Sequence, residues 1–416
     1  MRMVLRIRNA VPWRMVMATV IALGVASSAG SSALAATAVT PDTITTSTSG
    51  GCGTVPYIAP DAPAHVLSSL PSRYAADYTG FTDYPIVKSA WANWKPKKKS
   101  GFNIQIVWLP ENNPVDNAEL ASVVSTLKAS GKVKTIQVQQ VTADTDVAGQ
   151  LQQLQTAINR KPNLIIAIPI SPASAAPLID KAGKEGIPTV VPSIGVPGPY
   201  DVSVYTNVYL STAATTADVA RDAGGNGSFL AVQGVPGVPN NDDAVNAWTA
   251  VLKRCPNISI AGTVDGYYQS AATQAGVQQF LSTHPSPLSG IVQAGTMGTG
   301  IFAAYAQVGG TAPSMADTGA TEGSLAYWHA NPNYKGAAVL LESGQAGKTA
   351  AGVAMRMLAG DGVKLNTLLE QPFVVSTRKQ LDAIWNSSWS LSSTTDVPPP
   401  AGTYFAPSYM DGFFNH

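Results

Sequence analysis

The chain has 416 residues, of which 45% are hydrophobic and 12% are charged. This composition is typical of a packed protein and excludes an intrinsically disordered one. The length exceeds the usual size of one hydrophobic core, so we expect about two domains with extensions. The formal net charge of +1 gives no reason to expect binding to nucleic acid.

Residues 1–35 have the features of a secretory signal peptide. They contain four arginines and no acidic residue, and the apolar run Met15–Val25 precedes the small-residue site Ala33-Leu34-Ala35. An uncleaved membrane anchor is the alternative, but the apolar run is short for a spanning helix. Removing this segment leaves 22 basic against 25 acidic side chains, a net charge of −3. Because of the signal peptide, we expect export to the periplasm or to the extracellular face of the cell envelope.

Residues 36–100 are predicted to form an N-terminal linker and extension. Thr, Ser and Gly predominate in the first part, which is typical of a flexible leader, and Pro and aromatic residues predominate in the second. The basic run from Lys95 to Lys99 is better explained as a solvated turn than as a nucleic-acid patch.

Cys52 and Cys255 are the only cysteines, and in an oxidising compartment we expect them to pair. Lipidation of Cys52 is a less favoured alternative.

Strands and helices alternate from residue 101 onwards. The clearest unit runs from Asn163 to Val191, where four apolar residues precede Pro169 and a β-branched pair follows Pro188. Such apolar runs suit strands buried on both faces of a parallel sheet, and the residues between them have helical spacing. Further strands are expected at Phe102–Leu109, Lys134–Val141, Phe229–Val235, Ile258–Val264, Ile291–Ala294, Ala337–Leu341 and Phe373–Val375. Helices are expected at Leu120–Lys128, Gln150–Asn159, Ala213–Ala220, Asp243–Leu252, Ala272–Leu281 and Gly300–Val308. This alternation predicts an α/β fold with mostly parallel sheets.

The segment from about Gly101 to Val375 resembles the periplasmic (type I) sugar-binding proteins of the ribose-binding type. The block from Asn163 to Val191 carries the family's order of apolar residues and Pro, a helix, Gly-Ile-Pro and a valine pair. Thr206-Asn207 corresponds to the crossover between lobes, and Gln233-Gly234 with Pro236-Gly237 matches a glycine turn. Gly319 and Gly323 bracket another turn. The resemblance implies two Rossmann-like lobes joined by a multi-strand hinge. Lobe one would hold residues 101–206 and about 343–362, lobe two 207–342 and about 363–376, and 377–416 would form a C-terminal tail.

The resemblance also implies a function without catalysis. It predicts an exported protein that captures a small polar ligand between its lobes, in the first place a carbohydrate or polyol, and delivers it to the membrane permease of an ABC transporter. A ligand that bears an amine or another modification is an alternative, and so is a role as sensor subunit for a membrane receptor. A cytoplasmic regulator of the lactose-repressor kind is excluded because the signal peptide stands where a helix-turn-helix would be. We expect a monomer with no cofactor and no nucleic-acid partner.

No residue pattern in the chain predicts an enzyme. The four histidines, at 65, 284, 329 and 416, show no metal-ligand spacing, and no Gly-x-Ser-x-Gly elbow occurs. The adjacent pair Asp242-Asp243 suits a helix start better than glycoside cleavage. Gly298-Thr-Gly300, with Asp317 further on, is a passable dinucleotide fingerprint, so an exported dinucleotide-binding enzyme is a less favoured alternative.

Ligand contacts are expected at strand ends, because ligands of open α/β sheets bind beyond the carboxyl ends of the strands. Trp108 would either stack on an apolar sugar face or pack in the core. Asn113 lies where the family has an Asn-Pro pair that contributes to sugar contact, and it would either bond a ligand hydroxyl or cap its own turn. The predicted set is Trp108, Asn113, Asp116, Ser171, Asn207, Asp242, Tyr267, Thr296, Thr318 and Glu322.

Several positions depart from the pattern of the ribose-type proteins. Ser171 replaces an aspartate, Asp242 an arginine, Gly295 an asparagine, Thr318 an aspartate and Leu341 a glutamine. The arginine–carboxylate grip on vicinal hydroxyls is therefore absent, and we do not expect a simple pentose bound in the ribose manner. An acid at the arginine position, together with Asp116, favours a ligand that is rich in donors or positively charged.

The C-terminal tail carries a dense aromatic cluster. Aromatic residues at this density usually dock on a surface of the same chain. We expect the tail to pack across the hinge or against the N-terminal extension. The cluster consists of Tyr404, Phe405, Tyr409, Phe413 and Phe414.

Overall fold

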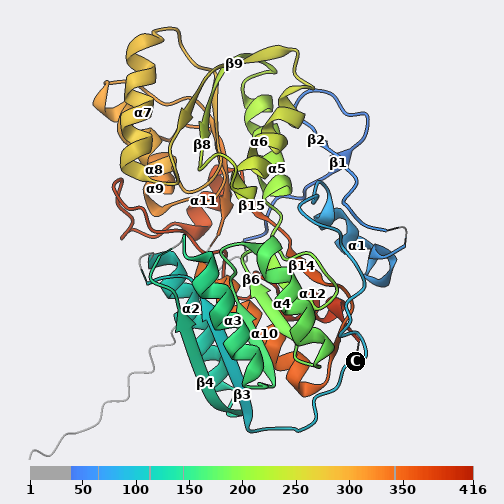
Figure 1. Ribbon diagram of the computed structural model, residues 1–416. Coiled ribbons are helices and arrows are strands. Elements are labelled where there is room, and N and C mark those ends of the chain that lie inside the picture. The colour runs from blue at the N-terminus through green and yellow to red at the C-terminus, as the bar shows by residue number, and fades with distance from the viewer. Residues whose placement is uncertain (1–38, 64, 112–113, 144, 342, 416) are drawn as a thin grey trace, which may run out of the picture. The chain divides into compact units, whose positions relative to one another are not determined.

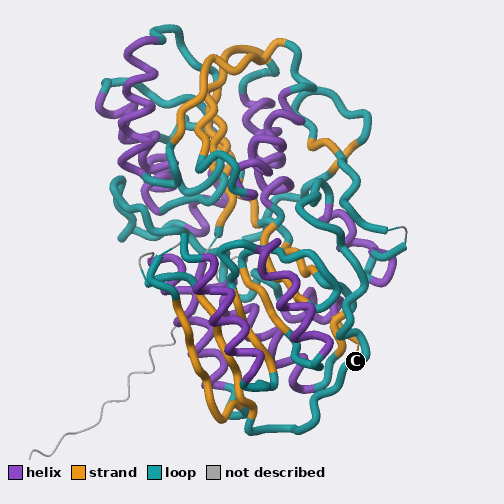
Figure 2. The backbone as a smooth tube through the Cα atoms, in the orientation of Figure 1, coloured by secondary structure: helices purple, strands orange, loops and turns teal. Residues whose placement is uncertain are grey.

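The computed structural model describes residues 39–63, 65–111, 114–143, 145–341 and 343–415. Two sheets of six strands form its framework, and helices cover both faces of each sheet (Figure 1). Figure 2 shows these strands between layers of helix. The predicted α/β fold with two mostly parallel sheets is confirmed. The predicted signal peptide, residues 1–35, lies outside the described residues. None of the described helices is long and apolar enough to cross a membrane.

The first sheet has the strand order β14-β7-β6-β5-β3-β4, and all its neighbouring strands are parallel. Its two central strands, β5 and β6, are buried along their whole length, as their unbroken apolar runs predict. The strands are β3 (Phe102–Trp108), β4 (Val133–Gln140), β5 (Leu164–Ala167), β6 (Thr189–Pro192), β7 (Asp201–Thr206) and β14 (Thr367–Glu370).

Helices lie on both faces of this sheet because successive strand residues point to opposite sides. Ile165 belongs to one core cluster with Leu154 and Ile179, whereas Ile166 belongs to another with Leu127 and Ala354. On the Ile166 side, α10 packs along α2. The helices of this lobe are α2 (Pro114–Ala129), α3 (Val147–Asn159), α4 (Pro172–Lys184) and α10 (Ser343–Ala359).

The second sheet has the strand order β15-β12-β11-β10-β8-β9, and only β15 among these strands runs antiparallel to its neighbour. Its strands are β8 (Asn226–Gln233), β9 (Asn257–Asp265), β10 (Gly290–Gln293), β11 (Met315–Asp317), β12 (Gly336–Leu340) and β15 (Phe373–Val375). Its helices are α5 (Val208–Asp222), α6 (Pro239–Leu252), α7 (Ser270–Thr283), α8 (Gly298–Gln307) and α9 (Glu322–Ala330).

The strand placement corrects one expected lobe boundary. We expected the segment from about residue 363 to belong to lobe two, but β14 pairs with β7 and completes the first sheet. Only β15, which begins three residues after β14 ends, joins the second sheet. The chain therefore crosses between lobes after Thr206, near Leu341 and between Glu370 and Phe373.

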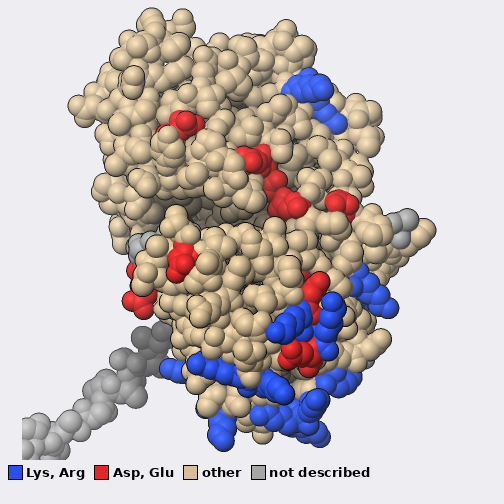
Figure 3. All heavy atoms as spheres, in the orientation of Figure 1, with Lys and Arg blue, Asp and Glu red and all other residues tan. Residues whose placement is uncertain are grey.

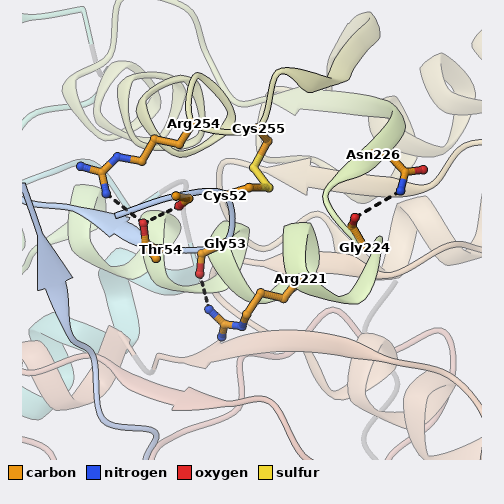
Figure 4. Close-up of a disulfide and its surroundings, with 9 residues drawn as sticks. Cys52, Gly53, Thr54, Arg221, Gly224, Asn226, Arg254 and Cys255 are labelled. Atoms are coloured by element: carbon orange, nitrogen blue, oxygen red, sulfur yellow. Dashed lines mark hydrogen bonds between the residues drawn. A yellow bond between two sulfur atoms is a disulfide. The ribbon is translucent and has the colours of Figure 1, made fainter. Parts of the chain in front are cut away.

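The leader is not the flexible linker that its composition suggested. Thr46 and Ser47 pair in register with Val55 and Pro56. A disulfide joins Cys52 to Cys255, the residue that follows α6 and its C-terminal turn, so the Cys52 thiol is not free to carry a lipid (Figure 4). Arg254 donates a hydrogen bond to Thr54, and Arg221 donates to the Gly53 carbonyl (Figure 4). Arg254 also donates to the Ser47 carbonyl. The leader is thereby fixed to lobe two.

The rest of the N-terminal extension packs on lobe one, where Tyr74 and Tyr78 lie in the core cluster that also holds Ile166. The tail likewise contacts both lobes. Leu381 packs with strands β12 and β15, whereas Phe413 packs in the core of lobe one. The Tyr409 ring stacks on Tyr74 at a centroid distance of 4.3 Å. The aromatic tail therefore packs against the N-terminal extension, one of the two arrangements expected.

The remaining short elements belong to the extension and the tail. The extension holds β1 (Thr46–Ser47), β2 (Val55–Pro56), η1 (Leu67–Ser69), α1 (Ser72–Ala75) and η2 (Ala76–Tyr78). The C-terminal part holds β13 (Gly362–Val363), α11 (Arg378–Ile384), α12 (Pro407–Met410), η3 (Asp411–Phe413) and β16 (Phe414–Asn415).

Candidate ligand-binding site

A cavity of about 380 Å³ lies at the carboxyl ends of the strands of lobe one. Residues just after β3, β5 and β6 and at the end of β7 form one wall, and Val208, Asn240 and Leu341 from lobe two form another. A hollow between lobe one and lobe two is visible in Figure 3, with acidic side chains on both sides of it. The lining residues are Leu109, Asp116, Glu119, Ile168, Ser193, Ile194, Tyr205, Thr206, Val208, Asn240, Leu341, Ala346 and Tyr404.

Other surface cavities are at least as large but lie elsewhere. One of about 460 Å³ lies between the leader and α5, with Asp42, Thr45 and Arg221 in its wall. It is not at the carboxyl ends of either sheet. We therefore take the cavity between the lobes as the candidate site, because strand-end positions are where this architecture places ligands.

Glu119 is the most deeply buried charged side chain of this cavity. It lies on α2 and is 2% exposed, and Ser193, just after β6, donates a 2.6 Å hydrogen bond to its Oε1. Burial raises the pKa of the Glu119 carboxyl to about 8, and the negative charge of Asp116 on the same helix adds to the effect. The helix α10 approaches Glu119 closely, since a Cβ on Gly347 would lie 2.8 Å from Glu119 Cγ.

A second carboxyl lies behind the cavity, where the chain crosses between lobes. Thr206 Oγ1 donates a 2.8 Å hydrogen bond to Glu370 Oε2, and Tyr404 from the tail is hydrogen-bonded to the same carboxyl. Burial raises the pKa of Glu370 well above its usual value. The crossover strands β7 and β14 and the tail therefore meet at one buried acid.

More acidic groups lie where the extension approaches lobe two. Tyr205 donates its hydroxyl hydrogen to Asp83 Oδ2. Burial, together with the nearby Asp83 and Asp242, raises the pKa of Asp243 to about 8. Tyr268 is near both aspartates of α6, and burial together with their charge raises its pKa to about 12. Several carboxyl groups therefore lie close together in this region, and their mutual repulsion favours the protonated form of Asp243.

Of the predicted ligand-binding residues that the structure describes, Asp116 lines the cavity. Asn113 lies outside the described residues. Trp108 is fully buried, and its Nε1 donates a 3.0 Å hydrogen bond to the Asp116 carbonyl oxygen. Trp108 is therefore placed to hold the start of α2, next to the cavity wall.

Four predicted residues lie at the N-terminal ends of helices. Ser171 is at the N-cap of α4 and donates to Ser174 Oγ at 2.8 Å, and Asn207 caps α5 by accepting from the Leu210 amide at 2.9 Å. Asp242 accepts from the Gly237 amide at 3.2 Å in the first turn of α6. In α9, Glu322 accepts from Ser393 Oγ at 2.6 Å. Each of these side chains is hydrogen-bonded within the protein.

The remaining three predicted residues lie at strand ends of lobe two. Tyr267 is 48% exposed, Thr296 donates its amide to the Thr318 carbonyl at 3.0 Å, and Thr318 Oγ1 donates to Thr212. Tyr267, Tyr268 and Thr296 all have positive φ angles, which is strained for residues other than glycine. The structure does not bring these residues into the wall of the cavity.

Sequence reasoning missed Glu119, Ser193, Thr206, Asn240 and Tyr404. Glu119 was lost because the predicted helix began at Leu120, whereas α2 begins at Pro114. With the earlier start, Asp116 and Glu119 are three residues apart and share a helix face, a signal that could have been found. Tyr404 lies outside the segment that carries the family resemblance, so that comparison had no position for it.

The candidate dinucleotide motif has a packing role. A Cβ on Gly300 would lie 2.3 Å from the Ser270 carbonyl oxygen, so this glycine lets α8 approach the start of α7. Asp317 is buried and accepts hydrogen bonds from Gln293 Nε2 at 2.6 Å and Ser324 Oγ at 2.5 Å. Burial raises the pKa of Asp317 to about 7. Within the described residues, no group of three or more His, Cys, Asp or Glu is placed to hold a metal ion.

Residues 106–362, more than half of the chain, match the periplasmic binding protein domain family. The chain therefore belongs to this family of substrate-binding proteins. A comparison with curated proteins found no significant match.

Solved structures of ABC-transporter proteins show the same fold. A periplasmic ribose ABC transporter structure from Conexibacter woesei has a TM-score of 0.59 at 17% identity, covering 70% of this chain and 97% of that one. A solute-binding protein from Bacillus halodurans with bound myo-inositol has a TM-score of 0.58 at 14% identity, covering 69% and 98%. A solute-binding protein from Thermobispora bispora has a TM-score of 0.57 at 20% identity, covering 70% and 88%.

Proposed function

We propose that this protein is an exported solute-binding protein that captures a carbohydrate or polyol between its lobes and delivers it to an ABC-type permease. The observation that carries the proposal is the cavity at the carboxyl ends of the first sheet, walled by both lobes. Hydroxyls of Ser193, Thr206 and Tyr404 and the amide of Asn240 line it, and these groups suit a ligand with several hydroxyls.

The ligands of related structures support the same class. One solute-binding protein of this fold, from Actinobacillus succinogenes, holds D-allose, and the one from Bacillus halodurans holds myo-inositol. Hinge closure between lobes would exclude water and strengthen each hydrogen bond to such a ligand. We further propose binding without turnover, in a monomer, with Asp116 among the ligand contacts. The predicted signal peptide supports export.

Thermal shift with a panel of monosaccharides and polyols tests this function. A true ligand should raise the midpoint of unfolding progressively with its concentration, because it binds only the folded state. Ser193→Ala should then weaken binding by about fivefold, the usual effect of one lost hydrogen bond. Ser282→Ala, on the exposed surface of α7, is the matched control and should bind as the unaltered protein does. A panel in which no sugar or polyol shifts the midpoint would refute the carbohydrate assignment.

A further inference from the structure

The cavity between the lobes is lined by two carboxylates and by no cationic side chain. Asp116 and Glu119 are in its wall, whereas none of the described lining residues is Lys, Arg or His. Glu370 adds a third carboxyl behind Thr206 and Tyr404. Lys and Arg side chains gather instead at the end of lobe one that lies away from the hollow (Figure 3).

Glu119 is buried without a positively charged partner in the described part of the chain. Ser193 reaches it from the end of β6 and donates one hydrogen bond. The ionisable groups that face it are Asp116 on its own helix and Tyr404 from the tail, and neither is cationic. From α10, the element packed against α2, Gly347 contacts Glu119, and its neighbour Lys348 is exposed.

In such a position nothing cationic among the described residues stabilises the ionised form of the carboxyl, and buried charges in proteins are normally paired. The neighbouring Asp116 makes the site more negative and so does not compensate. A ligand that brings its own positive charge would supply the missing partner. A charge-assisted hydrogen bond to a desolvated carboxylate is also roughly twice as strong as a neutral one.

We propose that the ligand of this cavity bears a protonated primary amine, which the Glu119 carboxylate holds with the support of Asp116. The ligand class is then amino sugars and amino polyols. This inference rests on the proposed function, since it names the kind of carbohydrate or polyol that the same site binds. The ammonium group offers three donors to the acidic side, and the ligand hydroxyls face Ser193, Thr206 and Asn240. On binding, Glu119 is ionised and any proton on its carboxyl passes to the buffer.

Matched ligand pairs that differ in one amino group test the inference. We would measure binding of D-glucamine against D-glucitol and of D-glucosamine against D-glucose by titration calorimetry. Where a pair binds, we expect the dissociation constant of the amine to be at least about tenfold lower than that of its neutral partner. This is the effect of one charge-assisted hydrogen bond. Repeating the titration in buffers with different heats of ionisation should show protons released with the amine and not with its neutral partner.

Glu119→Gln separates the role of the charge from that of the shape. The substitution keeps an oxygen that accepts from Ser193, so the fold should be retained, and circular dichroism and the melting curve would verify this. We expect it to abolish the preference for the amine and the proton release, so that the amine and its neutral partner bind the variant with similar affinity. Glu185→Gln, an exposed glutamate after α4, is the control and should change neither.

The outcomes distinguish this inference from the proposed function. Neutral members that bind as tightly as their amines would overturn the inference and leave the carbohydrate assignment standing. Amine preference that persists in Glu119→Gln would overturn the assignment to this residue. If no compound of either pair binds, and none of the wider panel does, both the proposed function and the inference are refuted.

Discussion

Gly347 of α10 lies so close to Glu119 of α2 that a Cβ on the glycine would be 2.3 Å from the Glu119 carbonyl oxygen. That contact is with backbone, which does not yield as a flexible side chain would. The glycine therefore permits the two helices to approach at the point where α2 presents its buried carboxyl to the cavity.

Gly347→Ala should force α10 and α2 apart. We expect a loss of about 1–3 kcal/mol in the free energy of unfolding, as for other overpacked sites, together with weaker ligand binding. Urea denaturation would measure the first effect. Gly352→Ala in the same helix is the control, because a Cβ there meets nothing within 4 Å. This control should be neutral or more stable by up to about 1 kcal/mol, from helix propensity. Equal stability of the two variants would contradict the packing argument.

The disulfide between Cys52 and Cys255 joins residues 203 positions apart. Replacing both by Ser should lower the free energy of unfolding by about 2–5 kcal/mol, because the unfolded chain is no longer constrained. Urea denaturation of the two proteins, each with and without reductant, would measure it. Reductant should destabilise the unaltered protein toward the double variant and leave the double variant unchanged. An unaltered midpoint in the Ser variant would show that Arg254 and Arg221 suffice to hold the leader.

The strands and helices of the core were largely predictable because their signals are local. Ile165 and Ile166 lie in an apolar run followed by a proline turn, and both proved fully buried in β5. Short elements without such patterns were missed, among them β7 and β11. β14 was missed as well, and its segment was assigned to lobe two because the sequence does not show that strands only two residues apart join different sheets.

The candidate site was far less predictable, because its wall is made by segments distant in sequence. Asp116 was found because it stands at a position where the related sugar-binding proteins tend to have an aromatic residue. Glu119 and Tyr404 come together only through the packing of the tail on lobe one, which no local pattern encodes. The density of aromatic residues predicted that the tail would dock, but it did not identify Tyr74 as a partner.

Tyr409 ties the tail to both the extension and the first sheet. Its hydroxyl lies 2.8 Å from Asp77 Oδ2 and 2.7 Å from the Leu369 carbonyl oxygen. Tyr409→Phe should therefore lower the free energy of unfolding by about 1–3 kcal/mol, since the acceptor that receives the single hydroxyl hydrogen loses its donor. Tyr57→Phe, which removes a hydroxyl from a ring that is 44% exposed, should have little effect. Urea denaturation would compare them, and equal midpoints would argue against these hydrogen bonds.

The buried Asp317 makes stability depend on pH. Its folded-state pKa, raised by burial to about 7, exceeds its ordinary value of 3.8, so the folded protein binds the proton more tightly than the unfolded chain. The stabilisation is complete below about pH 4 and is lost as the pH rises through 7. The unfolding free energy should therefore fall between pH 4 and pH 7, and Asp317 contributes at most about 1.4 kcal/mol per pH unit to this fall. Asp317→Asn should remove that contribution. Asp265→Asn, at an exposed carboxylate, is the control. Parallel pH profiles for Asp317→Asn and the unaltered protein would contradict this.

Glu119 should make the affinity for an amine rise with pH, whereas the stabilisation from Asp317 falls as the pH rises. Burial raises the pKa of this carboxyl to about 8, so below pH 8 it is protonated in the empty cavity and must lose its proton to hold an ammonium group. An alkyl amine keeps its charge up to about pH 9, since amines of this kind have a pKa near 10. The dissociation constant of D-glucamine should therefore rise as the pH falls from 8 to 6, by up to about tenfold per unit. Calorimetry at pH 6, 7 and 8 would measure it, with D-glucitol and the Glu119→Gln variant as flat controls. A constant affinity for the amine across this range would show that its ammonium group does not meet the Glu119 carboxylate.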